Sequence, residues 1–311
     1  MDQDPDRGEA DYHRPVLAEI VVELMAPVLP GIVVDATFGG GGHTRRLLDE
    51  FGEDVTMIAL DRDPEALANA GGLSATVLEA NFADIDTAVS SVTDEEISGV
   101  LFDFGVSSHQ LDEPGRGFSY RREGPLDMRM GPDASLTADQ IVNDWPVEDI
   151  TRIIRQFGEE PLARRIARAI VAARPIDSTA TLSTIIADAM PAARRRAGHP
   201  ARRTFQAIRI AVNEELTAVA RGVSKAVDMV RPGGRVVAIS YHSLEDRIVK
   251  QEFAARARGC TCPPDLPVCG CGNTAEVRVL TRKPIRAGDE EIEENNRARS
   301  AVLRAVEKVA S

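Results

Sequence analysis

Apolar and polar residues follow one another along the first hundred residues in a pattern that predicts alternating helices and strands. Residues 15–26 carry apolar side chains at helical spacing, and Pro15 stands where a helix commonly begins. Short apolar runs that are typical of buried strands follow at 32–36, 56–60, 77–80 and 100–103. Helical patterns at 44–51 and 64–70 separate the first three of these runs. Strands that alternate with helices predict a parallel sheet built from β-α-β units.

Helical patterns replace the strands after residue 103. Thr137 and Gln140 form a capping-box pattern that predicts the start of a helix. Further helices are expected at 147–157, with Gly158 as the C-cap, and then at 161–173, 182–190 and, as one long helix, about 204–230.

The strand pattern returns near the end of the chain. A Pro-Gly-Gly turn precedes an apolar run at 235–240, and two more strands are expected at 277–280 and 301–305, with helix as a competitor for the last. An α/β domain is therefore predicted in two parts, with an inserted all-helical domain between them. The expected boundaries are 12–112 and 213–311 for the two parts and 113–212 for the insert.

A glycine-rich turn, Gly39 to Gly42, joins the first predicted strand to the helix that follows. Because glycine has no Cβ, the backbone of such a turn can approach a ligand closely. The dinucleotide fingerprint is excluded, since counting from Gly39 puts Thr44 where its third glycine is required. No Gly-Lys-Ser/Thr of a P-loop follows either. A turn of this kind after Asp35 suits a ligand that need not carry phosphate, such as S-adenosylmethionine.

Two side chains at the ends of the next strands fit an adenosine group. Asp61 ends the second strand, where a carboxylate can accept both ribose hydroxyls. Phe82 follows the third strand and can pack on the adenine face. The alternatives are that Asp61 caps the next helix and that Phe82 belongs to the core.

Composition and charge narrow the class of protein. No stretch of the 311 residues approaches the roughly 18 consecutive apolar residues of a membrane span, and the acidic N-terminus does not resemble a signal peptide. We therefore expect a cytoplasmic protein. A net charge of −12 argues against nucleic-acid binding, but residues 152–209 contain twelve arginines and only four acidic residues. This segment predicts a phosphate-binding surface, with a helical domain of merely solvated arginines as the alternative.

All four cysteines lie within residues 260–271, as the pairs Cys260/Cys262 and Cys269/Cys271. Four thiolates can bind zinc, but zinc sites usually place two residues between the cysteines of a pair, not one. We expect no metal and thiols that are free or reversibly oxidised, with structural zinc as the alternative.

Several longer motifs cover most of the chain from about residue 13 to residue 307. They are His13–Leu17, Asp35–His43, Asp61–Pro64, Asp103–Asp112, Arg116–Ser119, Gly124–Met130, Thr204–Leu216 and Ser240–Arg247. Together they resemble the bacterial methyltransferases that modify cytosine N4 in small-subunit (16S) ribosomal RNA. Phe104 and His109 depart from that family's usual Leu and Pro, and neither change removes a polar group that the cofactor would need.

The resemblance implies a Rossmann-like S-adenosylmethionine-dependent methyltransferase fold with an inserted all-helical domain. It implies small-subunit ribosomal RNA, or the ribosomal particle, as the partner, and it says nothing of the oligomeric state. The cofactor contacts that it implies are Gly41, Gly42, His43, Asp61, Phe82, Asp103 and Gln110. The glycines, Asp61 and Phe82 are also indicated by the residues themselves, whereas Gln110 rests on the resemblance alone.

Asp103 is expected to be catalytic because it ends the fourth strand, where open α/β sheets place their ligands. Its carboxylate could accept a hydrogen bond from the cytosine amine or orient the cofactor. DNA amino-methyltransferases usually carry an Asp/Asn-Pro-Pro-aromatic motif at this point, which the chain lacks, so both roles stay open. Secondary candidates to contact the base or its phosphate, or merely to cap loops, are Ser107, Ser108, His242 and Ser243.

Other functions stay open at this point. Methylation of DNA or protein uses the same cofactor, and a non-catalytic assembly factor could bind both cofactor and ribosomal RNA. The glycine-rich turn together with Asp61 and Asp103 argues against a non-catalytic role. A nicotinamide oxidoreductase is disfavoured by the failed glycine register. The arginine-rich insert, chiefly its Arg194–Arg203 cluster, is expected to hold the RNA.

Overall fold

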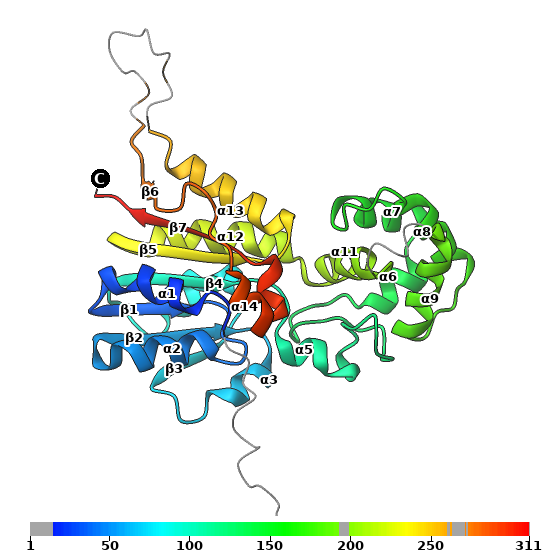
Figure 1. Ribbon diagram of the computed structural model, residues 1–311, viewed down its shortest axis with the longest axis horizontal. Helices are drawn as coiled ribbons and strands as arrows, with labels where there is room; N and C mark the ends of the chain where they lie inside the picture. The colour runs from blue at the N-terminus through cyan, green and yellow to red at the C-terminus, as the bar shows by residue number, and fades with distance from the viewer. Residues whose placement is uncertain (1–14, 193–198, 260–261, 263–270, 272, 311) are drawn as a thin grey trace, which may run out of the picture. The chain divides into compact units, whose positions relative to one another are not determined.

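The computed structural model describes residues 15–192, 199–259, 262, 271 and 273–310 (Figure 1). It divides into two compact units: Met1–Gly105 with Leu216–Ser311, and Val106–Glu215. The second unit thus begins at residue 106 and ends at residue 215, whereas the sequence pattern placed the insert at 113–212. Among the described residues, no helix is both long and apolar enough to cross a membrane.

The first unit contains a seven-stranded sheet with the order β3-β2-β1-β4-β5-β7-β6. The strands are β1 (Gly31–Asp35), β2 (Val55–Asp61), β3 (Ala75–Glu79), β4 (Ile97–Asp103), β5 (Val230–Ser240), β6 (Val277–Val279) and β7 (Val302–Lys308). Strands β1 to β5 are parallel to one another, and β7 is antiparallel to both of its neighbours, β5 and β6. The predicted strands are confirmed, including the last, for which helix was the competitor. The strand order reverses between β1 and β4, the place where open sheets of this kind bind ligands.

Helices cover both faces of this sheet (Figure 1). They are α1 (Ala18–Met25), α2 (Gly42–Phe51), α3 (Pro64–Leu67), α4 (Ile85–Ser90), α12 (Glu215–Met229), α13 (Ser243–Arg256) and α14 (Asp289–Glu294). Successive strand residues point to opposite faces, so Val33 joins the core with α1 and α2, while Val34 joins the core with α4, α12 and α13. Burial on both faces explains why these strands appear as continuous apolar runs in the sequence.

The second unit is helical and has a hydrophobic core of its own, which includes Ile141, Ile154 and Ile166. Its helices are α5 (Ser108–Asp112), α6 (Ala138–Asp144), α7 (Val147–Gln156), α8 (Ala163–Ala172), α9 (Thr179–Ala189) and α11 (Arg202–Asn213). The capping box predicted at Thr137 and Gln140 is confirmed at the start of α6. The fold is therefore α/β with an inserted all-helical unit, as the sequence predicted.

The single long helix expected at about 204–230 is wrong. Helix α11 ends at Asn213, Glu214 adopts a left-handed conformation with φ 50°, and α12 begins at Glu215. Apolar residues keep a helical spacing on both sides of the break, so periodicity alone does not reveal one left-handed residue.

The C-cap expected at Gly158 is also wrong, because α7 has Phe157 as its C-cap and the left-handed residue is Glu159, with φ 47°. Gly158 has a different role. A Cβ on it would lie 2.7 Å from the carbonyl oxygens of Ile154 and Arg203.

The side chain of Asn213 holds a loop of the second unit in place. Its Oδ1 accepts a hydrogen bond from Met130 N at 2.8 Å, and its Nδ2 donates to Met128 O at 2.7 Å. Both Asn213 and Met128 are buried, and Met128 has a left-handed backbone with φ 62°. The side-chain amide of Asn213 therefore provides hydrogen-bond partners for Met130 N and Met128 O, which lie outside helices and strands.

We expect Asn213→Ala to lower the free energy of unfolding of the second unit by about 2–4 kcal/mol, because two buried backbone groups lose their partner. Urea unfolding followed by circular dichroism measures the change. Gln251→Ala, on an exposed position of α13, is the control and should change stability by less than about 0.5 kcal/mol. Equal effects of the two substitutions would contradict this role for Asn213.

Candidate active site

Three carboxylates end three neighbouring parallel strands of the first unit. Asp35 ends β1, Asp61 ends β2 and Asp103 ends β4. Because the carboxyl ends of parallel strands meet at one edge of a sheet, the three groups gather around the loop between β1 and α2. That loop contains Gly39–Gly42, which the sequence assigned to a cofactor.

The loop is shaped so that backbone, not side chain, faces the edge of the sheet. Gly41 is the N-cap residue of α2 and has a left-handed backbone with φ 73°. A Cβ on Gly41 would lie 2.8 Å from the ring of Phe38. Gly42 begins the helix, so its N–H is among those that helix hydrogen bonds leave unpaired. The backbone angle and the Phe38 ring thus require glycine at residue 41, within the turn that the sequence assigned to a ligand.

Asp61 accepts hydrogen bonds from this loop and from its own turn. Its Oδ2 accepts from Gly39 N at 2.7 Å and its Oδ1 from Asp63 N at 2.9 Å. A carboxylate has about four acceptor positions, so two backbone donors leave positions for ribose hydroxyls. The helix cap of α3 is Asp63, whose side chain accepts from Glu65 N. The alternative that Asp61 caps that helix is therefore wrong. Burial raises the pKa of Asp61 to about 6.

Asp103 lies between a tyrosine and a histidine. Its Oδ1 accepts a hydrogen bond from the hydroxyl of Tyr241 at 2.7 Å, and its Oδ2 lies 3.6 Å from Nε2 of His43. The backbone N of Asp103 donates to Thr37 Oγ1 at 2.6 Å, which ties β4 to the glycine-rich loop. The carboxylate is about one-quarter exposed, so a ligand can reach it.

His43 is almost fully buried, with 6% of its surface exposed, and lies between two carboxylates. Burial lowers its pKa, but Asp103 and Asp35 favour the charged ring more strongly, so the pKa lies above its usual value. At 3.6 Å the contact with Asp103 is longer than a hydrogen bond. Nε2 of His43 therefore has no hydrogen-bond partner within the part of the chain that the structure describes. A buried polar atom of this kind indicates a place for a ligand.

Phe82 belongs to an aromatic cluster. Its ring centroid lies 5.8 Å from that of Phe102 and 5.6 Å from that of Phe104. Gly222 of α12 makes room for this ring, because a Cβ there would lie 2.8 Å from it. Phe82 packs against the core, so the core role that the sequence left open is present. The residue is only half-buried, so part of it remains accessible.

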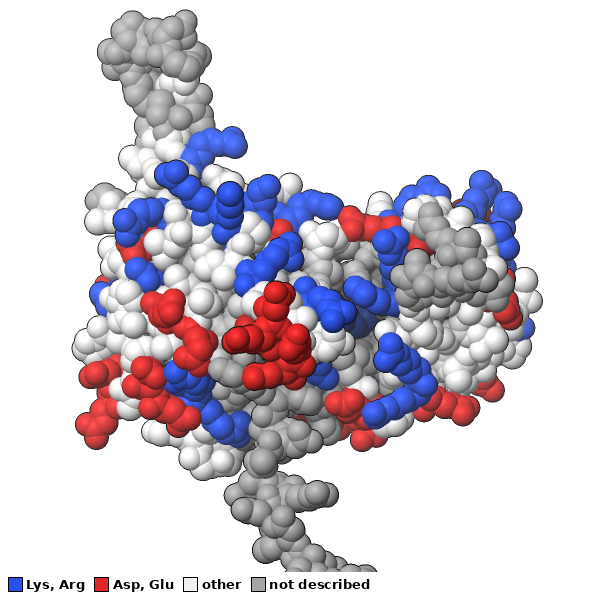
Figure 2. Space-filling view, viewed as in Figure 1, with Lys and Arg blue, Asp and Glu red and all other residues white. Residues whose placement is uncertain are grey.

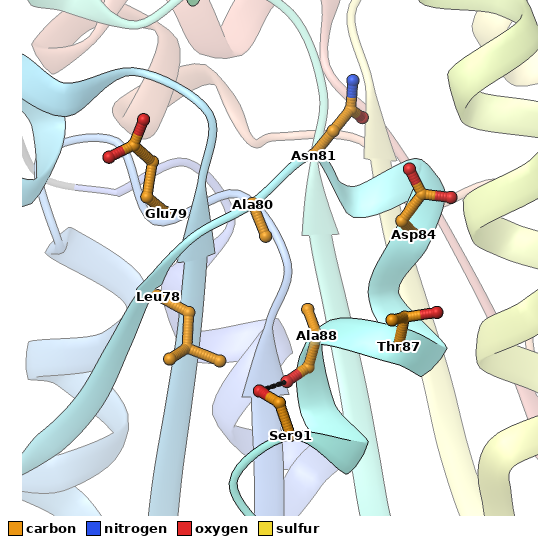
Figure 3. A pocket seen from close by; sticks show the side chains of 8 residues that line it. All are labelled: Leu78, Glu79, Ala80, Asn81, Asp84, Thr87, Ala88 and Ser91. Atoms are coloured by element: carbon orange, nitrogen blue, oxygen red, sulfur yellow. Dashed lines mark hydrogen bonds between the residues drawn. The ribbon is translucent and has the colours of Figure 1, made fainter. Parts of the chain in front are cut away.

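A hollow of about 430 Å³ opens beside β3, and Figure 3 shows Glu79, Asn81 and Asp84 among the residues that line it. None of the predicted cofactor residues lines this hollow. Asp84 is bound to Arg221 and Lys225 of α12, and the side chain of Asn81 accepts from Ala83 N. The polar groups here hold the local structure, so we do not place the cofactor in it.

Acidic side chains gather over α14 on the face that Figure 2 shows. One of them, Glu291, accepts a hydrogen bond from Leu17 N at 2.6 Å and so ties α14 to the start of α1. Its charge is among those that raise the pKa of His43. The carboxylates favour a positively charged ligand at this edge of the sheet.

Comparison with known proteins identifies the family of the chain. A model of the MraW methylase family matches residues 10–309. The chain belongs to the MraW methylase family. It is 49% identical over 309 residues to a protein of Heliobacterium modesticaldum, with 96% of this chain and 99% of that protein covered. It is 50% identical over 310 residues to a protein of Symbiobacterium thermophilum, with 96% and 98% covered. Both relatives are named "Ribosomal RNA small subunit methyltransferase H".

Membership in the MraW methylase family confirms that the chain is a methyltransferase, for which S-adenosylmethionine is the cofactor. One observation of the first unit fits this cofactor: the buried Nε2 of His43 has no hydrogen-bond partner among the described residues. Gln110 lies in the second unit. It is buried, and it exchanges hydrogen bonds with Ser107 at the start of α5.

Some sequence predictions concern residues that the structure does not describe. Arg194, Arg195, Arg196, Cys260 and Cys269 lie outside the described residues, so the four-thiol cluster stays a prediction. Arg174 and Arg209 have structural roles, because Arg174 donates to Val142 O and Trp145 O and Arg209 pairs with Glu215.

Sequence reasoning missed Tyr241, although it quoted the motif that contains it. It gave His242 two possible roles, and the structure supports the capping role. His242 is the N-cap residue of α13 in a capping box with Glu245. The pattern His-Ser-Leu-Glu, with an acid three residues after the cap, is the signal that could have revealed this.

The sequence predicts that Asp61 accepts the ribose hydroxyls, and on this prediction Asp61→Asn should weaken S-adenosylmethionine binding by about 1.5–3 kcal/mol. The ionised carboxylate is the better acceptor and its pKa is about 6, so wild-type affinity should fall as the pH drops through about 6. Calorimetry between pH 5 and 8 measures both effects.

Asp54→Asn is the matched control, since Asp54 is exposed and lies just before the opposite end of β2. It should bind the cofactor normally and keep the wild-type pH dependence. Asp61→Asn should lose that pH dependence. Wild-type affinity for Asp61→Asn would show that the carboxylate serves only the loop.

Proposed function

We propose that the chain transfers a methyl group from S-adenosylmethionine to the exocyclic N4 amine of a cytidine in small-subunit (16S) ribosomal RNA. One observation carries the proposal: the glycine-rich loop, Asp61 and Asp103 share one edge of the sheet in a chain that matches the relatives over nearly its whole length. The name of the two relatives indicates that the substrate is small-subunit ribosomal RNA. The resemblance of the sequence motifs to cytosine-N4 methyltransferases indicates that N4 is the atom that accepts the methyl group.

The residues proposed to hold the cofactor are those that the sequence indicated. In the first unit these are Gly41, Gly42 and His43 of the loop, together with Asp61, Phe82 and Asp103, and the resemblance adds Gln110 of the second unit. When bound, S-adenosylmethionine supplies a methyl group made electrophilic by a sulfonium. Asp61 orients the ribose through two hydrogen bonds, the exposed part of Phe82 packs on adenine, and the carboxylates of the edge favour the cofactor's positive charges.

Asp103 is proposed as the catalytic residue. The lone pair of the cytosine N4 amine is conjugated with the ring, so the amine is a poor nucleophile until an acceptor turns it. Asp103 accepts one N–H of this amine, which draws the nitrogen lone pair out of conjugation so that it faces the methyl group. The nitrogen–methyl bond would form as the methyl–sulfur bond breaks, with S-adenosylhomocysteine as the leaving group and the proton of N4 released to Asp103. Catalysis of this kind depends on positioning, because attack on the methyl carbon must be in line with the bond that breaks.

The second unit is proposed to hold the RNA through its arginines. Arg164, Arg165 and Arg168 are exposed on α8, and Figure 2 shows basic side chains over this part of the unit. The same unit carries exposed arginines at 155 and 202. Ribosomal RNA is a cytoplasmic substrate in bacteria, so the proposal also places the chain there. The target base must leave its stack to reach the methyl group.

The proposal predicts one reaction product. Incubation of purified protein with labelled S-adenosylmethionine and either small-subunit RNA or small-subunit particles should give N4-methylcytidine in a nucleoside digest, and Asp61→Ala should greatly reduce it. Mass spectrometry of the digest identifies the product. Transfer to DNA or protein alone would contradict the RNA substrate, and cofactor binding with no turnover would instead support an assembly factor.

Replacing Arg164, Arg165 and Arg168 with Gln should weaken RNA binding and flatten its salt dependence by about 0.7–0.9 in log–log slope for each phosphate that the variant no longer neutralises. Filter binding at several salt concentrations measures this, with cofactor affinity as a check on the fold.

The matched control replaces Arg46, Arg221 and Arg278 with Gln. These three arginines of the first unit pair with carboxylates, and their replacement changes the net charge by the same amount. The control should keep the wild-type salt slope. Equal slopes for both triple variants would mean that the arginines of α8 are only solvated.

A further inference from the structure

Tyr241 follows the last residue of β5 and directs its hydroxyl at the carboxylate of Asp103. The hydrogen bond from Tyr241 Oη to Asp103 Oδ1 is 2.7 Å long, and it joins residues 138 positions apart in the sequence. Burial and the charge of Asp103 raise the pKa of Tyr241 well above 10. The hydroxyl therefore keeps its proton at neutral pH and acts as a donor.

The backbone of Tyr241 is held independently of this bond. Glu245, which is 1% exposed, accepts a hydrogen bond from Tyr241 N at 2.8 Å through Oε2. The same oxygen accepts from His242 N at 3.2 Å. A buried carboxylate thus fixes the corner between β5 and α13. The backbone that carries the tyrosine ring is therefore rigid, and precise placement of the hydroxyl requires such a backbone.

The bond to Asp103 is not needed to join the two strands. Asp103 already pairs with Ile239 in the parallel ladder of β4 and β5, and Phe104 N donates to Ile239 O at 3.0 Å. Removal of the phenolic hydroxyl would leave this ladder intact. What the hydroxyl adds is control over the orientation of the carboxylate.

The two oxygens of Asp103 differ for this reason. Oδ1 is engaged by Tyr241, whereas Oδ2 has only the longer contact of 3.6 Å with His43. A neutral donor such as a phenol orients a carboxylate without adding a positive charge beside it. Oδ2 therefore keeps its capacity to accept a further hydrogen bond.

We propose that Tyr241 is a positioning residue for methyl transfer, which holds Asp103 by Oδ1 so that Oδ2 accepts the N–H of the target amine. The inference rests on the proposed function, because it specifies which oxygen of Asp103 accepts the hydrogen bond from the target amine. Glu245 acts one step further away, through the backbone of Tyr241.

The test compares Tyr241→Phe with wild type in steady-state kinetics on small-subunit RNA. The ring stays in place, so the thermal midpoint should match that of wild type. We expect kcat to fall by about tenfold to a hundredfold, with KM for the RNA within about twofold of wild type. Partial unfolding would also lower kcat at constant KM, so the unchanged thermal midpoint is the measurement that excludes loss of folded enzyme.

A double-mutant cycle tests whether Tyr241 acts through Asp103. Single-turnover rates are compared for wild type, Tyr241→Phe, Asp103→Asn and the double variant. On the Asp103→Asn background the second substitution should change the rate by less than about twofold, because the group that Tyr241 orients is already altered. An equal loss of rate on both backgrounds would overturn the inference.

Tyr120→Phe is the matched control for loss of a phenolic hydroxyl. The ring of Tyr120 packs on His199 and Phe205 in the second unit, and removal of its hydroxyl oxygen should leave kcat unchanged. If wild-type protein forms no N4-methylcytidine, the proposed function fails. If wild type turns over and Tyr241→Phe keeps its kcat, only the role of Tyr241 fails.

Discussion

The carboxylate of Asp35, at the end of β1, accepts a hydrogen bond from Thr44 Oγ1 at 2.7 Å and another from Thr37 N at 3.2 Å. The group is 1% exposed, and burial raises its pKa. These bonds close the glycine-rich loop onto the first turn of α2. Thr37, held in this way, accepts the backbone N–H of Asp103, and Gly39 of the same loop donates to Asp61. The positions of the glycine-rich loop, Asp61 and Asp103 therefore depend on the buried carboxylate of Asp35.

The charge of the chain is distributed between its two units in a way that suits two different ligands. The edge of the sheet in the first unit carries Asp35, Asp61 and Asp103, a set that favours a cation and disfavours phosphate. The described arginines of α8 lie in the second unit. A positively charged methyl donor and a polyanionic acceptor are thus attracted by separate surfaces. Under the proposed function, this division lets a chain of net charge −12 act on RNA.

Sequence patterns predicted the inner strands β1, β2 and β4 because each is buried on both faces and stands out as an apolar run. They predicted Asp61 and the glycines because strand ends and glycine turns are local features. They did not predict the break at Glu214 or the left-handed Glu159, because a single backbone angle leaves no trace in hydrophobic spacing. Tyr241 was missed for another reason. Its partner, Asp103, is 138 residues away, and only the pairing of β4 with β5 brings them together.

The antiparallel position of β7 beside β5 has a consequence for the order in which the chain folds. Helices of the second unit pack on one another within one continuous segment, 106–215, so their contacts are short in sequence. The sheet instead needs β4 to meet β5 and β5 to meet β7, across long separations. Contacts between distant segments form slowly because the intervening chain must first be brought together. During synthesis the helical insert can fold as soon as it leaves the ribosome. The sheet of the first unit is complete only when residues 302–308, which form β7, have been synthesised. We therefore expect the helical unit to complete its fold before the unit that carries the candidate active site.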